Sequence, residues 1–153
     1  MLHFAYGSNM SSALMRRRCP QACALGTATI RGWEFVITPD GFGSIAPRAG
    51  GVVHGVLWRL TPRDLAAINA YESLDSGLYV RRLLPVEHGG RRELALVYVA
   101  RRRGRGRPRP GYISVVTGAA REWRLPERHV RALARWSPSG WHGARWKDTR
   151  DLG

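Results

Sequence analysis

Apolar residues at every second position predict strands throughout the first 100 residues of this chain. The clearest run is residues 52–60, in which Val53 and Leu57 fall on one face and Val56 and Trp58 fall on the other. The other expected strands are residues 2–6, 27–38 (one or two strands bent at Gly32), 79–86 and 93–100, with 43–47 as a shorter candidate. We expect the last two long strands to form a hairpin through a turn at His88-Gly89-Gly90.

Apolar residues at helical spacing predict four helices, at residues 11–18, 62–72, 113–123 and 126–136. The second has the clearest beginning, because Thr61 is a good N-cap and Pro62 suits the first helical position. Asp64 then lies in the first turn, where the helix dipole favours a carboxylate. Several strands with few helices, in mixed order, predict an α+β fold: a small mixed barrel or strongly curled sheet with flanking helices.

The length of 153 residues fits one domain that can bury a substantial core. We assign residues 1–136 to this domain and residues 137–153, which are rich in Trp, Arg and Gly, to an irregular C-terminal tail. No run of 18 apolar residues is present, and the N-terminus lacks the charged and apolar regions of a signal peptide. The expectation is a soluble cytoplasmic protein that does not associate with membranes.

The cysteine and histidine pattern predicts no metal site. Cys19 and Cys23 are the only cysteines, and no Cys/His pair follows them at metal-ligand spacing. The five histidines are scattered, without an HExxH or similar pattern. We expect two reduced, partly buried thiols.

Charge is the most unusual feature of the composition. The formal net charge is +14, with 25 Lys and Arg residues against 11 Asp and Glu residues, and Lys147 is the only lysine. A high-GC genome explains arginine in place of lysine, but not the shortage of acidic residues. A field of this sign attracts anionic ligands, nucleic acid or acidic surfaces.

The segment from Arg101 to Pro110 concentrates this charge between the last predicted strand and the third predicted helix. Its Gly-Arg-Gly-Arg-Pro core resembles an AT-hook, in which extended arginines lie in a narrow minor groove of DNA. The alternative is a solvated loop, because an arginine-rich composition readily produces so short a motif.

The residues Tyr6-Gly7-Ser8-Asn9 predict a sharp turn between the first strand and the first helix. Gly7 tolerates backbone angles that other residues avoid, and Ser8 and Asn9 can hydrogen-bond to their own turn. Unpaired backbone N–H groups at the start of a helix make such a turn a cradle for an anion or oxyanion. The alternative is a plain connection in which Ser8 and Asn9 cap the helix.

Glu72 is the candidate acid/base. It ends the second predicted helix among apolar neighbours, whereas most charges in the chain are arginines elsewhere. A carboxylate that faces a cavity there would be desolvated, and its pKa would move toward the range useful for proton transfer. The alternative is a solvated glutamate paired with an arginine. No G-x-S-x-G motif surrounds Ser8, so the chain offers little support for a seryl nucleophile.

Several sequence blocks, in this order, resemble the γ-glutamylcyclotransferase-like (AIG2-like) family: residues 4–10 (FAYGSNM), 53–58 (VHGVLW), 71–79 (YESLDSGLY) and 110–112 (PGY), the last followed by 118–123 (GAAREW). The order and spacing hold over residues 2–134, and the segment after residue 136 lies outside the resemblance. The resemblance implies a small mixed α/β barrel-like fold with a cavity at one end.

The resemblance also implies a set of site residues. The family's γ-glutamyl-binding turn falls on Tyr6, Gly7, Ser8 and Asn9, its acid/base glutamate on Glu72, and further pocket tyrosines on Tyr79 and Tyr112. Ser73 stands where the family often has glycine, a departure that bears on substrate identity more than on catalysis.

The reaction implied by the resemblance is the cyclisation of a γ-glutamyl amino acid, peptide or amine. The substrate α-amine attacks the γ-carbonyl and releases 5-oxoproline and a free amine, so no enzyme nucleophile and no metal or organic cofactor is needed. Glu72 would take a proton from the α-ammonium and return one to the leaving amine.

Two alternatives stay open. One is a basic protein that binds nucleic acid through Arg101–Arg109 on the same scaffold. The other is a biosynthetic enzyme that removes a γ-glutamyl protecting group from a pathway intermediate. The sequence predicts neither the group attached to the γ-amide nor the oligomeric state.

Overall fold

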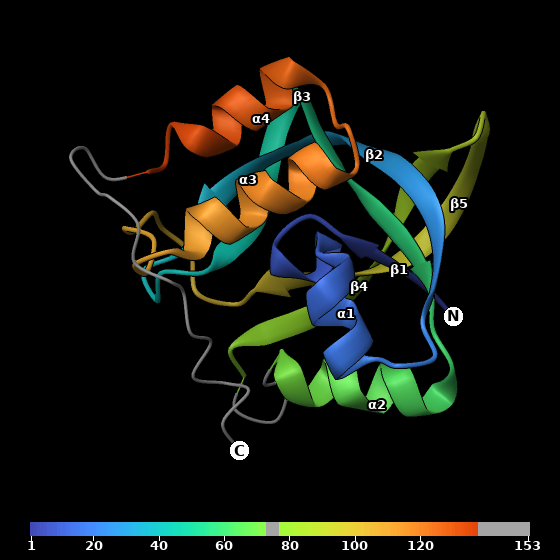
Figure 1. Ribbon diagram of the computed structural model, residues 1–153. Helices are drawn as coiled ribbons and strands as arrows, with labels where there is room; N and C mark the ends of the chain where they lie inside the picture. Colours follow the sequence, from blue (N-terminus) through green and yellow to red (C-terminus); the bar gives the residue numbers. More distant parts are fainter. Residues whose placement is uncertain (73–76, 138–153) are drawn as a thin grey trace.

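Five strands close into a barrel, in the order β1-β3-β2-β4-β5 (Figure 1). The computed structural model describes residues 1–72 and 77–137. The strands are β1 (Leu2–Ala5), β2 (Cys23–Ile37), β3 (Gly43–Arg59), β4 (Tyr79–His88) and β5 (Arg91–Ala100). A short 3₁₀ turn, η1 (Ser8–Met10), precedes the helices α1 (Ser12–Arg18), α2 (Pro62–Tyr71), α3 (Tyr112–Glu122) and α4 (Glu127–Ala134). The predicted α+β class and small mixed barrel are confirmed, and the predicted tail lies outside the described residues apart from Ser137.

The long β2–β3 hairpin forms the main wall of the barrel. Its register runs from Ile37 opposite Gly43 to Cys23 opposite Arg59. Residues 48–51, which the sequence pattern left outside any strand, continue β3, so the two segments expected at 43–47 and 52–60 are one strand. The bend expected at Gly32 is a register shift between Arg31 and Trp33, and Gly32 has a φ of +86°, which favours glycine.

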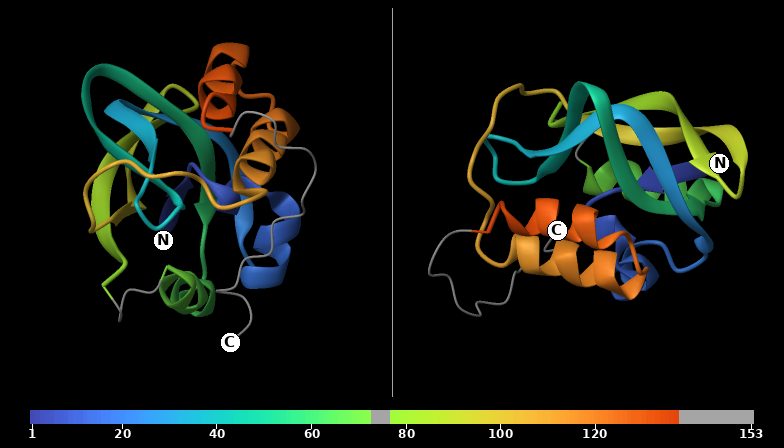
Figure 2. Two further views of the ribbon diagram at one scale, coloured as in Figure 1. Left: turned by 90° about the vertical axis from the view of Figure 1, so that its left-hand side faces the viewer. Right: turned by 90° about the horizontal axis from the view of Figure 1, so that it is seen from above.

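Alternation along the strands separates two apolar cores. Val53 and Leu57 lie in the core inside the barrel with Phe4, whereas Val56 and Trp58 belong to the core between the barrel wall and the helices. The predicted two-faced character of residues 52–60 is therefore confirmed. Figure 2 shows α1, α3 and α4 on one side of the barrel, where they cover the second core.

The helix ends are set largely by local signals. Thr61 and Asp64 form a capping box at the start of α2, in which Asp64 N donates to Thr61 Oγ1 at 3.1 Å and Thr61 N donates to Asp64 Oδ2 at 3.4 Å. Within the described residues no helix is both long and apolar enough to cross a membrane.

The expectation of two partly buried thiols is wrong in detail, because Cys19 is fully buried and Cys23 is exposed. Burial raises the pKa of the Cys19 thiol to about 12, with the Asp64 carboxylate adding to the effect.

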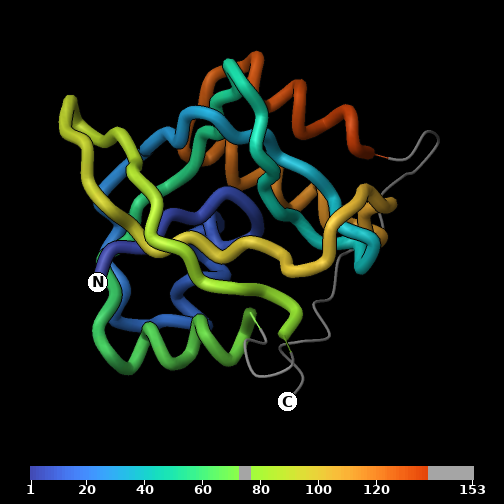
Figure 3. Tube along the Cα trace, turned by 180° about the vertical axis from the view of Figure 1, so that it is seen from behind, coloured from blue at the N-terminus to red at the C-terminus, as the bar shows by residue number. Residues whose placement is uncertain are grey.

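The barrel is closed, but its strand pairings differ in length, and few residues are paired along the side between β2 and β4, which is the open side of the barrel. β4 pairs with β5 along ten residues of each strand, from Tyr79–Ala100 to His88–Arg91. In contrast, β2 meets β4 in a single ladder pair, Thr29 with Glu87. The β4–β5 hairpin projects beyond the rest of the barrel (Figure 3), and the other end of β4 is not paired with β2.

Candidate active site

The turn after β1 places two polar side chains in the protein interior. Met10 N donates to Gly7 O at 3.1 Å and Ser11 N donates to Ser8 O at 3.0 Å, which closes the 3₁₀ turn. The α1 helix is capped by Ser11, whose Oγ accepts from Leu14 N at 3.3 Å. Ser8 and Asn9 do not cap this helix, so the alternative of a plain capped connection is wrong. Both side chains are buried and face a cavity.

All seven predicted site residues line this one cavity. It is lined by β1, the turn, the end of α2, β5 and the starts of β3, β4 and α3, and its lining includes Tyr6, Gly7, Ser8, Asn9, Glu72, Tyr79 and Tyr112. These residues are spread over the chain from position 6 to position 112, and the closed barrel brings them together. The structure thus places them around one cavity, and their assignment as catalytic and substrate-binding residues stays a prediction.

Glu72 lies at the C-terminal end of α2 and is buried rather than solvated. Only 9% of the residue is exposed, and its backbone N donates to Ile68 O at 2.9 Å as the helix ends. Asn9 Nδ2 donates to Glu72 Oε1 at 3.2 Å across the cavity. The alternative of a solvated glutamate is therefore wrong, and the carboxylate faces a concave, partly apolar site.

The tyrosine hydroxyls are anchored to the backbone of the barrel. Tyr79 Oη donates to Gly43 O at 2.6 Å, and Gly43 N donates to Tyr112 Oη at 3.0 Å. Tyr6 Oη donates to Tyr98 O at 2.5 Å. Only glycine fits at position 43, because a Cβ there would lie 2.7 Å from Tyr112 Oη. Two phenol groups, those of Tyr79 and Tyr112, are thus held at the start of β3, which the sequence marked only as a short candidate, and the phenol of Tyr6 is held by β5.

Sequence reasoning missed several residues of this site: His3, Arg18, Gly43, Tyr71 and Tyr98. Burial, followed by the nearby Glu72 carboxylate, raises the pKa of Tyr98 above its usual range. Burial also lowers the pKa of His3 to about 4. Period-two alternation places His3 and Tyr98 on strands, but nothing local in the sequence distinguishes a strand residue near a cavity from any other.

Arg18 is the missed residue with the most direct contacts to the turn. Its Nη1 donates to Asn9 Oδ1 at 2.6 Å and to Ser8 Oγ at 3.2 Å. Its guanidinium stacks over the ring of Tyr71, with Cζ 3.7 Å from the ring centroid. In sequence it is the last of three consecutive arginines, and no local signal separates it from Arg16 and Arg17.

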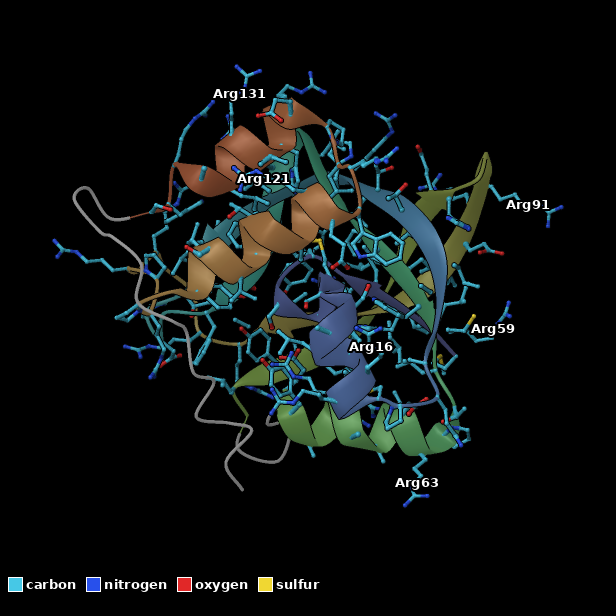
Figure 4. All side chains as sticks on the ribbon, in the orientation of Figure 1. Arg16, Arg59, Arg63, Arg91, Arg121 and Arg131 are labelled. Atoms are coloured by element: carbon cyan, nitrogen blue, oxygen red, sulfur yellow. The ribbon has the colours of Figure 1, made fainter. Side chains whose placement is uncertain are left out.

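Most other arginines in the described part of the chain are exposed. Arg59, Arg63, Arg91 and Arg131 extend outward at the edges of the view in Figure 4, and Arg16 and Arg121 are exposed on the helices that face the viewer. Within the described residues no group of three or more His, Cys, Asp or Glu side chains gathers closely enough to hold a metal ion.

The arginine-rich segment after β5 is attached to the barrel. Arg101 N donates to Leu78 O at 3.1 Å, Gly106 N to Ile37 O at 2.8 Å, and Arg109 N to Gly41 O at 3.1 Å. In Figure 3 the segment runs beside the β2–β3 turn. The alternative of a simple solvated loop is therefore incomplete, because the backbone is held at several points while the arginine side chains are exposed.

This segment borders a second groove, at the open side of the barrel between β2 and β4. Its apolar lining includes Trp33, Val36, Ile45, Val80 and Val99. Five arginines also line it, namely Arg82, Arg101, Arg102, Arg103 and Arg105. Its acidic residue is Glu34, which accepts from Arg105 Nη2 and from Arg48 Nη1, each at 2.8 Å. The groove is therefore strongly cationic.

Comparison with known proteins agrees with this architecture. The family model described as "Gamma-glutamyl cyclotransferase, AIG2-like" matches residues 3–124. The γ-glutamylcyclotransferases of Mus musculus and Homo sapiens are each 24% identical over 162 aligned positions, covering 99% of this chain and 86% of each relative.

Solved structures show the same fold. A γ-glutamyl cyclotransferase superposes with a TM-score of 0.86 at 23% identity, covering 99% of this chain and 96% of that one. YkqA from Bacillus subtilis superposes with a TM-score of 0.76 at 25% identity, covering 88% of this chain and 53% of that one. Because the family model spans most of the sequence, the chain belongs to the γ-glutamyl cyclotransferase, AIG2-like family of enzymes.

Proposed function

We propose that this enzyme releases 5-oxoproline from a γ-glutamyl amino acid, peptide or amine, with Glu72 as general acid/base. The observation that carries the proposal is the buried Glu72 carboxylate, which accepts from Asn9 Nδ2 at 3.2 Å inside a cavity lined by tyrosines. A buried carboxylate that accepts a hydrogen bond in a concave site is the arrangement expected of a proton-transfer group.

The reaction needs little covalent chemistry from the protein. The substrate α-amine nitrogen forms a bond to the γ-carbonyl carbon, and the bond from that carbon to the leaving amine breaks. Holding the glutamyl chain in a folded conformation makes the attack intramolecular and supplies much of the acceleration. Glu72 accepts the proton that the α-ammonium loses and delivers a proton to the leaving amine, so it is regenerated in each cycle.

The turn and the tyrosines bind and orient the substrate in this proposal. We expect backbone N–H groups at the start of the 3₁₀ turn (Gly7 to Asn9) to hold the substrate carboxylate or the developing oxyanion. In this proposal the Tyr79 and Tyr112 hydroxyls, anchored on Gly43, hold the glutamyl chain in its folded conformation. Binding of this kind needs no metal or organic cofactor.

The direct test is a panel of γ-glutamyl compounds with 5-oxoproline detected by mass spectrometry. The panel contains γ-glutamyl amino acids, glutathione, γ-glutamyl-lysine and γ-glutamyl amines. We expect release from at least one class, and the class identifies the group carried on the γ-amide. Folded protein that releases no 5-oxoproline from any member would contradict the proposal.

Removal of a γ-glutamyl protecting group in biosynthesis uses the same chemistry, and the genes adjacent to this one distinguish that use from amino-acid metabolism.

The cationic groove supports a second candidate function, the binding of nucleic acid. Arginines beside an aromatic and apolar floor are typical of surfaces that follow a phosphate backbone and stack exposed bases. We expect Arg101→Gln and Arg103→Gln to weaken binding of a fluorescent oligonucleotide, whereas Arg91→Gln, at the remote hairpin, has no effect. Anisotropy at 50 and 200 mM salt is the measurement, and a fall in affinity of roughly tenfold or more is expected across this range. Equal effects of all three substitutions would indicate attraction by net charge alone.

A further inference from the structure

Arg18, at the end of α1, lies behind the polar turn of the cavity and does not itself line it. It contacts Asn9 Oδ1 at 2.6 Å and Ser8 Oγ at 3.2 Å through the same Nη1. Asn9 in turn contacts Glu72 through its other amide atom, Nδ2, at 3.2 Å. The three side chains therefore form a row, from the guanidinium through the amide to the carboxylate.

The chemistry of the two outer groups determines which way the Asn9 amide faces. A guanidinium only donates hydrogen bonds, so the amide atom 2.6 Å from Arg18 must be the oxygen. An ionised carboxylate only accepts, so the amide atom facing Glu72 must be the NH₂ nitrogen. The oxygen and nitrogen of an amide are nearly alike in shape, and packing alone distinguishes the two orientations poorly. Arg18 and Glu72 together select one orientation.

We propose that Arg18 is a positioning residue, which orients the Asn9 amide so that its NH₂ group holds the Glu72 carboxylate. The inference rests on the proposed role of Glu72 as acid/base. Without Arg18 the amide can turn over and present Oδ1 to Glu72, so that two acceptors face each other. The carboxylate then loses a donor that favours its ionised form. Arg18 would thus influence proton transfer without touching the substrate.

The surroundings of Arg18 fit this role. Its guanidinium is stacked on Tyr71, and Tyr71 Oη lies 3.2 Å from Ser8 Oγ. Tyr71 directly precedes Glu72 in the chain, so the same contact ties the end of α2 to the turn. A lysine would carry the charge but not the flat, multi-donor surface that stacks on a ring and contacts two oxygens.

Several other titratable groups line the cavity and enter any pH dependence. They are His3 on β1, Tyr6 after it, Tyr71 at the end of α2, Tyr79 on β4, Tyr98 on β5 and Tyr112 at the start of α3. Burial lowers the pKa of His3 to about 4 and raises the pKa of Tyr98. His3 can therefore titrate in the same acidic range as a carboxylate, and a readout specific to Glu72 is needed.

The test compares Arg18→Met and Arg18→Lys with Arg17→Met, which removes an exposed arginine from the neighbouring position of α1. We expect Arg18→Met to lower kcat/KM for 5-oxoproline release by roughly tenfold or more, and to move the acidic limb of its pH profile upward by about one unit. The direction follows because a carboxylate that loses a hydrogen-bond donor holds its proton to higher pH. Arg18→Lys keeps the charge and should move the limb less, and Arg17→Met should not move it.

A carboxyl ¹³C NMR titration gives the same information without turnover. The Glu72 signal is assigned by its absence in Glu72→Gln, and its midpoint should rise in Arg18→Met. In an Asn9→Ala background, where no amide remains to be oriented, Arg18→Met should add little further shift.

An unchanged midpoint in Arg18→Met, or a full additional shift in the Asn9→Ala background, would overturn the proposal. If Arg18→Met does not fold, the Arg18→Lys titration, alone and with Asn9→Ala, decides in the same way. Absence of turnover in the wild type would refute the proposed function but leave the NMR result able to test Arg18.

Discussion

Replacing Glu72 by glutamine is expected to abolish turnover while leaving the fold intact. The amide of glutamine has nearly the same shape as the carboxylate. In the wild type Asn9 Nδ2 donates to Glu72 Oε1 at 3.2 Å, and the amide oxygen can accept the same hydrogen bond. It cannot take a proton from the substrate ammonium or return one to the leaving amine. General acid–base catalysis typically contributes a factor of 10²–10⁴, so we expect kcat to fall by at least about 100-fold. The measurement is 5-oxoproline release under saturating substrate.

Glu127→Gln is the matched control for this substitution. It makes the same chemical change on an exposed residue in the first turn of α4. We expect full activity from this variant, and circular dichroism spectra of both variants that superpose on the wild type. Retention of more than a few per cent of activity by Glu72→Gln would remove Glu72 from the acid/base role. The cyclotransferase activity would then need another proton acceptor in the cavity.

Gly55→Ala is expected to cause the largest loss of stability. A Cβ at this position of β3 would lie 2.2 Å from the carbonyl oxygen of Ala5 and 2.7 Å from Cζ of Phe4. Phe4 is fully buried inside the barrel, and the Ala5 carbonyl belongs to the backbone of β1, so neither can move aside cheaply. Overpacking of this kind costs about 3 kcal/mol. Because β1 leads directly into the Tyr6–Asn9 turn, displacement of β1 should also lower activity.

Gly118→Ala makes the same chemical change with the opposite expected sign. Gly118 lies within α3, and an added Cβ there meets no atom within 4 Å. Alanine favours the helix, so this variant should gain up to about 1 kcal/mol. Urea unfolding of both variants and the wild type measures the two effects. A free energy of unfolding for Gly55→Ala within about 1 kcal/mol of the wild type would show that β1 and β3 can separate at little cost.

Much of the secondary structure follows from local patterns. Alternating apolar positions predicted β1, β4 and β5, and Thr61 as N-cap with Pro62 after it predicted the start of α2, because strand alternation and helix capping act over a few residues. The sequence pattern did not predict that residues 43–59 form one strand. The bulge at Gly32 and the pairing of β3 with both β1 and β2 stabilise this strand, and these are long-range contacts.

The four sequence blocks that resemble the family also located the candidate site. They include Tyr6, Glu72, Tyr79 and Tyr112, all of which line one cavity. Local sequence around Glu72, taken alone, nevertheless favoured a solvated glutamate. Its burial is decided by the turn after β1, which packs against the end of α2 from more than sixty residues away.

The sequence by itself determined the fold class, the helix starts and a short set of candidate residues, since each depends on neighbouring positions or on motifs of a few residues. Only the tertiary structure decided which arginine among three reaches Asn9, which glycine lets Tyr112 approach a strand, and which side of the barrel stays open. These outcomes depend on contacts between residues far apart in the chain. Such contacts exist only once the barrel has closed, and no periodicity or composition encodes them.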